Sequence, residues 1–143
     1  MKKDKLDEIF SMQWEMNDLV FKKQGIKQTM IDLHLQGKGN DHNTNSDTNF
    51  WLKKYHEAMK DESRELDAEL PWKFWSKDKL DMQNIRVEII DQLHFWVSLA
   101  LTAGMDADNV FDIYSQKNKV NYTRQENGYC KANKDELDNK DIG

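Results

Sequence analysis

Two pairs of carboxylates are each spaced three residues apart in segments with helical periodicity. Glu62 lies within the apolar stripe of the segment 48–70, and Glu65 follows one turn later at its flank. Glu88 and Asp91 repeat this spacing inside the most apolar segment of the chain, 82–103. Residues three apart share one face of a helix, and unpaired carboxylates are rarely buried there. The first pair is either a solvated acidic face or part of a site; the second requires a buried Arg or Lys, or a shared metal.

Two such pairs facing each other across helices would form a metal site with oxygen ligands only. Oxygen ligands suit Mg²⁺, with Mn²⁺ as a substitute. The single cysteine, Cys130, and the scattered histidines offer no competing zinc site. A di-iron bundle is disfavoured because the paired Glu-x-x-His ligands are absent. His94 lies three residues beyond Asp91 on the same helix. It is either a further residue of the site or a lone core histidine bonded to backbone.

Two amides occupy positions where a core residue is expected. Gln13 and Asn17 fall in the middle of the apolar stripe that Leu6, Phe10 and Val20 form on a helical wheel. A buried amide is costly unless its hydrogen bonds are made. The pair is therefore either a satisfied core or interface amide, or a device that reads the edge of a planar ligand.

A basic stripe lies near the end of the helical region. Lys117, Asn121 and Arg124 recur at helical spacing on the face that carries Val110 and Tyr114. This stripe is either a solvated basic edge or a row of donors for phosphate oxygens. Together, four acids, a metal and a basic stripe indicate a polyphosphate site.

Helices must position all of these residues. One proline and few glycines leave long segments for helix, expected at 4–23, 26–36, 48–70, 82–103 and 106–125. Asp47 or Thr48 is expected to cap the third helix, and Asp106 or Asp108 the fifth. The Asn-rich segment 37–48 is expected to be a surface loop. The sequence predicts an all-α fold, a four- to five-helix bundle with a central, buried fourth helix.

The composition excludes several classes of protein. A formal net charge of −5 argues against binding to nucleic acid or to a membrane surface. No stretch is long and apolar enough to span a bilayer, and the N-terminal residues lack the apolar segment of a signal peptide. No membrane association is therefore expected. One cysteine favours a reducing, cytoplasmic location. We expect one domain at 1–130, followed by a charged, flexible tail at 131–143.

The motifs occur in an order that resembles a known family. Glu62-Ser-Arg-Glu65-Leu66, Trp72-Lys73-Phe74-Trp75, Glu88-Ile-Ile-Asp91 and His94-Phe95 resemble motifs of the dimeric all-α dUTPases. The stretch from Lys117 to Tyr129 resembles their C-terminal phosphate-binding motif, and equally that of the phage dCTPase–dUTPases. Gln13 and Asn17 stand in place of the N-terminal motif that reads the nucleobase. The likeness covers about Met12 to Tyr129.

The resemblance implies an all-α NTP pyrophosphatase fold related to the MazG-type enzymes, a homodimer and Mg²⁺. It implies three groups of site residues: metal ligands at Glu62, Glu65, Glu88 and Asp91; base and sugar contacts at Gln13, Asn17, Trp75 and His94; and phosphate contacts at Lys73, Lys117, Asn121 and Arg124. The Asn-rich segment is shorter than the lid-like insertion of longer family members, so their closing motion is not carried over.

The predicted activity is dUTP diphosphatase, which converts dUTP to dUMP and pyrophosphate. A metal-activated water would attack the α-phosphorus, with Glu62 as the base. The close alternative is a dCTP pyrophosphatase or a dual dCTPase–dUTPase, because a Gln amide offers both donor and acceptor to a pyrimidine. The alternative of another class is a non-catalytic helical interaction or regulatory protein.

Overall fold

The computed structural model describes residues 4–40, 42–128, 130 and 136–143, which form helices and no strand. The elements are α1 (Lys5–Lys23), α2 (Met30–Gly37), α3 (Asp47–Glu69), α4 (Met82–Thr102), α5 (Ala107–Glu126) and the short 3-10 helix η2 (Glu136–Asn139). The predicted all-α class is confirmed. The chain divides into two compact units, Met1–Met105 and Asp106–Gly143, and each is described by itself.

Each of the five α-helices begins at a residue whose side chain accepts a hydrogen bond from the first turn. These N-caps are Asp4, Thr29, Ser46, Asp81 and Asp106. Such caps satisfy backbone N–H groups that have no partner inside the helix. Asp106 was one of two predicted caps for α5, where it forms a capping box with Asn109. The cap of α3 was predicted wrongly: Ser46, not Asp47 or Thr48, accepts from the backbone of Asn49 at 3.1 Å.

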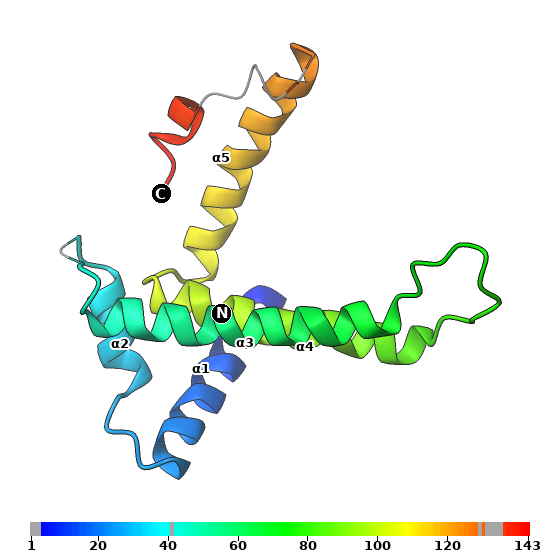
Figure 1. The fold of residues 1–143 in the computed structure, drawn as a ribbon. Helices are drawn as coiled ribbons and strands as arrows, with labels where there is room; N and C mark the ends of the chain where they lie inside the picture. The colour runs from blue at the N-terminus through cyan, green and yellow to red at the C-terminus, as the bar shows by residue number, and fades with distance from the viewer. Residues whose placement is uncertain (1–3, 41, 129, 131–135) are drawn as a thin grey trace. The chain divides into compact units, whose positions relative to one another are not determined.

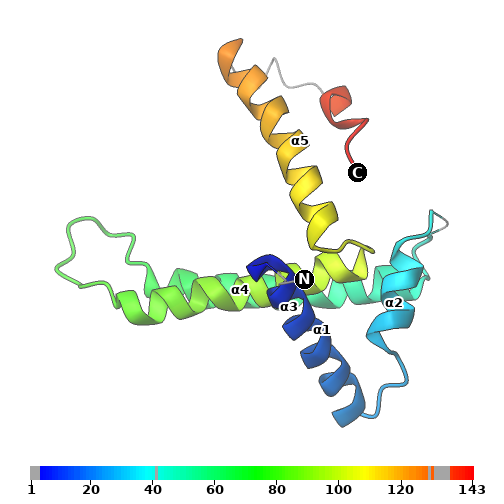
Figure 2. The ribbon, with the colours of Figure 1, turned by 180° about the vertical axis from the view of Figure 1, so that it is seen from behind.

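The first unit is built on the antiparallel pair α3 and α4, which lie side by side over most of their length (Figures 1 and 2). α1 and α2 pack against α4, and α2 also contacts α3. The core gathers where these helices meet, with Phe21, Met30, Leu33, Val97 and Leu101 all at most 2% exposed. Burial of apolar surface at this crossing is the main force that holds α1 and α2 on the pair.

Two glycines allow the ends of α2 and α4 to touch. A Cβ added to Gly37 would collide with the backbone oxygen of Thr102 and lie 2.6 Å from the nitrogen of Gly104. Gly104 itself has φ +81°, in the left-handed region that favours glycine. This contact fixes where α2 ends and where the Asn-rich connection to α3 begins.

The fourth helix differs from its predicted central, fully buried state. Its last residues, 97–102, are mostly buried, but Val87 is 44% exposed and Ile89 and Ile90 are each 51% exposed. Among the described elements, only α3 runs alongside the N-terminal half of α4 (Figures 1 and 2), so one neighbour covers one face and leaves the other apolar residues uncovered. Apolar periodicity alone could not distinguish an internal contact from this exposed face.

The second unit contains α5 and η2, which contact each other. Part of the predicted tail, 131–135, lies outside the described residues, and η2 follows at Glu136–Asn139. The division into a domain at 1–130 and a tail at 131–143 stays a prediction.

Candidate active site

Three carboxylates from α3 and α4 converge in the first unit. Glu62, Glu65 and Glu88 each offer one oxygen, and these oxygens all lie within 4.8 Å of one another. The antiparallel pairing of the two helices brings the two predicted i, i+3 carboxylate pairs together. Asp91 is half-buried and close enough to raise the pKa of Glu62 and Glu88, although it is not one of the three converging oxygens.

The carboxylates in this acidic cluster oppose each other's ionisation. Burial, together with Glu65, Asp91 and Glu88, raises the pKa of Glu62 from 4.5 to about 7. Burial and the neighbouring charges of Glu65 and Asp91 also raise the pKa of Glu88. Like charges at close range disfavour the ionised form. The cluster therefore accumulates negative charge that a cation or protons must balance.

The cluster fits a divalent cation. The Oε2 atoms of Glu62 and Glu88 are buried and have no hydrogen-bond partner within the described part of the chain. No Lys or Arg among the described residues forms an ion pair with either one, so the buried salt bridge considered for Glu88 is not formed there. Partnerless buried carboxylate oxygens are costly, and oxygen-only ligand sets suit Mg²⁺. Glu62, Glu65 and Glu88 could hold such an ion, with Asp91 beside them.

Gln13 and Asn17 are buried on α1, as their place on the apolar stripe suggested, at 7% and 5% exposure. Gln13 Nε2 donates to Asn17 Oδ1 at 2.8 Å, and Asn17 Nδ2 donates to the hydroxyl of Ser98 on α4 at 3.1 Å. His94 Nδ1 donates to Gln13 Oε1 at 2.7 Å. We call these four side chains the amide network. They bring three of the predicted base-contacting residues together.

Ser98 is the member of this network that sequence reasoning missed. Its sequence signal was its place in an apolar segment, four residues after His94. The alternative of a backbone-bonded core histidine is wrong for His94, which is exposed and bonded to Gln13. That description fits His34 instead, which is buried and donates from Nδ1 to the carbonyl of Leu101 at 2.7 Å.

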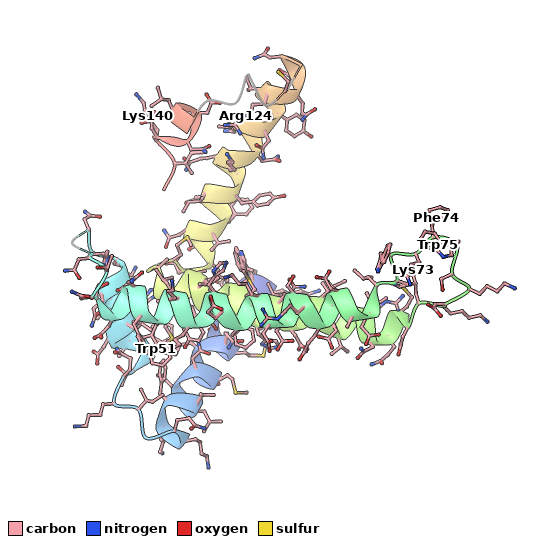
Figure 3. The ribbon with its side chains drawn as sticks, viewed as in Figure 1. Trp51, Lys73, Phe74, Trp75, Arg124 and Lys140 are labelled. Carbon is pink, nitrogen blue, oxygen red and sulfur yellow. The ribbon has the colours of Figure 1, made fainter. Side chains whose placement is uncertain are left out.

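Lys73 and Trp75 lie in the connection between α3 and α4, beyond the end of the helix pair (Figure 3). Trp75 is 64% exposed and stacks edge-to-face on Trp72 and Phe74. The ammonium of Lys73 lies 5.5 Å from the ring centre of Trp72. These side chains thus contact one another, and the structure does not bring them to the acidic cluster.

The predicted phosphate-binding stripe lies on α5 in the second unit, where two of its residues already have partners. Lys117 donates to Asn139 Oδ1 at 2.7 Å, and Arg124 Nε forms an ion pair with Asp138 at 3.1 Å. Asn121 is exposed on the same helix. Both acceptors belong to η2, so the 3-10 helix occupies donors that would otherwise be available to phosphate.

Comparison with known proteins identifies relatives for most of the first unit. The family model described as dUTPase matches residues 5–109. The chain is 32% identical over 104 residues to a dCTP pyrophosphatase of Enterobacteria phage LZ5, covering 55% of this chain and 60% of that protein. It is 29% identical over 111 residues to the dCTP pyrophosphatase of Enterobacteria phage T4, covering 60% and 65%. The chain thus spans less than two thirds of the length of these relatives.

No solved structure matches the chain. Within the described residues, none of the helices combines the length and apolar character that a membrane span requires. The family match at residues 5–109 includes the acidic cluster and the amide network, and it ends before the basic stripe of α5.

Proposed function

The chain belongs to the dUTPase family, and from that premise we propose that it is a metal-dependent nucleoside triphosphate pyrophosphatase. Its proposed substrate is a deoxypyrimidine triphosphate, with dUTP as the first candidate and dUMP and pyrophosphate as products. The observation that carries this proposal is the acidic cluster, whose buried oxygens on Glu62 and Glu88 have no hydrogen-bond partner among the described residues.

The proposed reaction is an in-line displacement at the α-phosphorus. Glu62, Glu65, Glu88 and Asp91 would hold Mg²⁺, or Mn²⁺ in its place, which when bound supplies positive charge against the triphosphate. Water attacks the α-phosphorus, the bond from that phosphorus to the bridging oxygen breaks, and pyrophosphate leaves. Glu62 accepts the proton of the attacking water. The pKa of about 7 belongs to the metal-free cluster; the charge of a bound cation would lower it and keep Glu62 ionised, as a base must be.

The remaining site residues are assigned to the two ends of the substrate. Lys73, Lys117, Asn121 and Arg124 would bind phosphate oxygens, since hydrogen bonds to an ionised phosphate are charge-assisted and strongest from cationic donors. Gln13, Asn17, His94 and Trp75 would contact the base and sugar. The hydrogen-bonded contacts among Gln13, Asn17 and His94 support this grouping.

A second candidate substrate is dCTP, alone or together with dUTP. Both phage relatives are named dCTP pyrophosphatase. Gln13 donates to Asn17 and accepts from His94, so its amide does not by itself select one pyrimidine over the other.

The proposed active form is a cytoplasmic homodimer, with the catalytic domain at 1–130 and the tail at 131–143. The uncovered apolar residues Val87, Ile89 and Ile90 of α4 support an additional partner surface, because clustered exposed apolar groups favour burial. A second copy of the chain is the partner we propose.

The test is pyrophosphate release from dUTP, dCTP, dTTP, dATP, dGTP and UTP, each with Mg²⁺ and with EDTA. Mg²⁺-dependent release from dUTP, with little from UTP or dTTP, is the expected result. Preference for dCTP would keep the mechanism and change the substrate. No release from any triphosphate would refute the proposal and favour a non-catalytic helical interaction protein.

A further inference from the structure

The hydrogen-bond direction within the amide network is determined at its buried end. The thioether of Met30 lies 3.5 Å from Asn17 Nδ2, and a thioether can only accept. The hydroxyl of Ser98 lies 2.9 Å from the carbonyl oxygen of His94 and 3.5 Å from Asn17 Oδ1. Its single proton goes to the nearer acceptor, the carbonyl of His94, so its oxygen is left to accept from Asn17 Nδ2 at 3.1 Å. Two acceptors therefore face the same atom of Asn17, and that atom must be the NH₂ group.

Gln13 passes this orientation on to His94. With its NH₂ group turned toward Ser98, Asn17 presents its oxygen to Gln13. The NH₂ group of Gln13 must therefore donate to Asn17 Oδ1, and the two atoms lie 2.8 Å apart. The oxygen of Gln13 then faces Nδ1 of His94 at 2.7 Å, which places the proton on Nδ1. In an uncharged imidazole with that proton, Nε2 is the hydrogen-bond acceptor. His94 is exposed, and no described residue bonds to its Nε2.

We propose that Ser98 is a positioning residue that, through Asn17 and Gln13, presents Nε2 of His94 as an acceptor for a donor group of the substrate. This inference rests on the proposed function, which assigns the amide network to the base and sugar. A deoxypyrimidine triphosphate carries suitable donors at the 4-amino group of cytosine, at N3–H of uracil and at the 3′-hydroxyl of the sugar. The O4 atom of uracil, an acceptor, would not pair with Nε2.

The tautomer of His94 is measurable without substrate, by long-range ¹H–¹⁵N NMR at a pH where the spectrum shows an uncharged ring. In the unmodified chain, Nδ1 is expected to be pyrrole-like and Nε2 pyridine-like. Ser98→Ala removes one of the two acceptors that orient Asn17. The side-chain amides of Asn17 and Gln13 can then both rotate by 180°, which would place the NH₂ group of Gln13, rather than its oxygen, against Nδ1 of His94. We therefore expect a growing fraction of the Nε2–H tautomer in this variant.

Thr102→Val is the matched control. Thr102 is as fully buried as Ser98 on the same helix, and its hydroxyl donates to the carbonyl of Ser98 at 2.7 Å. It makes no hydrogen bond to Asn17, Gln13 or the ring of His94, so its loss should leave the tautomer unchanged. A shared effect of both variants would indicate only a general loosening of α4.

Kinetics then identify the substrate donor. Ser98→Ala should raise KM about three- to tenfold with little change in kcat, as expected for one weakened neutral hydrogen bond. The comparison uses dCTP, dUTP and their 2′,3′-dideoxy analogues. If the 3′-hydroxyl is the donor, the dideoxy analogues lose their sensitivity to Ser98→Ala. If the base is the donor, they retain it.

Two results would overturn the positioning role: a proton on Nε2 of His94 in the unmodified chain, or a Ser98→Ala variant that matches Thr102→Val in both tautomer and KM. Absence of pyrophosphate release from every triphosphate is a separate outcome. It would refute the proposed function and the substrate role of His94 with it, while the tautomer measurement would still decide whether Ser98 orients the ring.

Discussion

Glu62 on α3 and Glu88 on α4 offer carboxylate oxygens within 4.8 Å of each other, and each also buries one oxygen that no described residue bonds. Two acids in this relationship resist simultaneous ionisation. Their charge state therefore links pH, cation binding and folding, and this linkage can be measured in the absence of substrate.

The metal-free chain should lose stability as pH rises from 4.5 to about 7. The pKa of Glu62 is raised in the folded state, from 4.5 to about 7, so the folded chain retains a proton that the unfolded chain releases. The stabilisation is fully present below the unfolded pKa and is lost as pH passes the folded one. Thermal melting with EDTA across this range measures it, and Glu62→Gln should flatten the profile.

The control for that profile is Glu57→Gln, which removes an exposed carboxylate of the same helix that is paired with Lys60. This variant should keep the decline with pH. An identical profile for Glu62→Gln and the unmodified chain would contradict the assignment of the raised pKa to Glu62.

Mg²⁺ should raise the melting temperature more at pH 8 than at pH 5. The cation binds ionised carboxylates, so protons compete with it in the acidic range. Melting curves with Mg²⁺ and with EDTA at both pH values provide the measurement. An equal gain at both pH values would argue that the cation binds elsewhere than at the acidic cluster.

Glu88→Gln should reduce metal-dependent turnover about a hundredfold or more while leaving the helices folded. The amide keeps the size of the side chain and removes one anionic ligand, and a catalytic metal contributes several kcal/mol to the transition state. Pyrophosphate release and circular dichroism are measured together, with Glu57→Gln as the control. Full activity in Glu88→Gln would remove this residue from the proposed site.

Gly37→Ala should destabilise the first unit by about 1–3 kcal/mol or more, because the new methyl group meets backbone rather than a movable side chain. Denaturant unfolding measures the loss. Gly39→Ala is the control: its Cβ would lie 3.3 Å from one backbone oxygen, that of Gln36, and a much smaller change is expected. Equal losses in the two variants would show that the contact between the ends of α2 and α4 is unimportant.

Asp138→Asn should increase the affinity for pyrophosphate about two- to fivefold, the range expected for a partly exposed ion pair. The carboxylate of Asp138 is bound to Arg124, a proposed phosphate ligand, and a bound anion must compete with it. Calorimetric titration measures the affinity. Asp141→Asn makes the same change in charge within the same segment, so an equal increase in both variants would indicate a general charge effect.

Much of the helical architecture was predictable from local signals. Pro71 and the capping residue Asp106 marked helix boundaries that the structure confirms within a few residues. The N-cap of α3 was missed because three adjacent residues, 46–48, are all good caps and only one is used. The exposed face of α4 was missed because an apolar residue has the same sequence signal on an inner or an outer face.

The candidate site was predictable in its residue types and not in its contacts. The helical wheel identified Gln13 and Asn17 as misplaced polar groups, and the structure shows both buried. Their partner Ser98 lies 81 positions from Asn17, and its place in an apolar segment four residues after His94 is too weak a signal to identify that contact. The carboxylate spacing indicated a shared face, whereas the pairing of α3 with α4 decided which carboxylates meet.

The contact between Gly37 and Gly104 also has a consequence for engineering the chain. It anchors the start of the Asn-rich connection, while the Ser46 cap and the hydrogen bond from Asn49 to the carbonyl of Thr44 anchor its end. Doubling the length of a flexible connection costs only about 0.6 kcal/mol in closure entropy. The connection is therefore a favourable point at which to insert a peptide tag or a reporter domain.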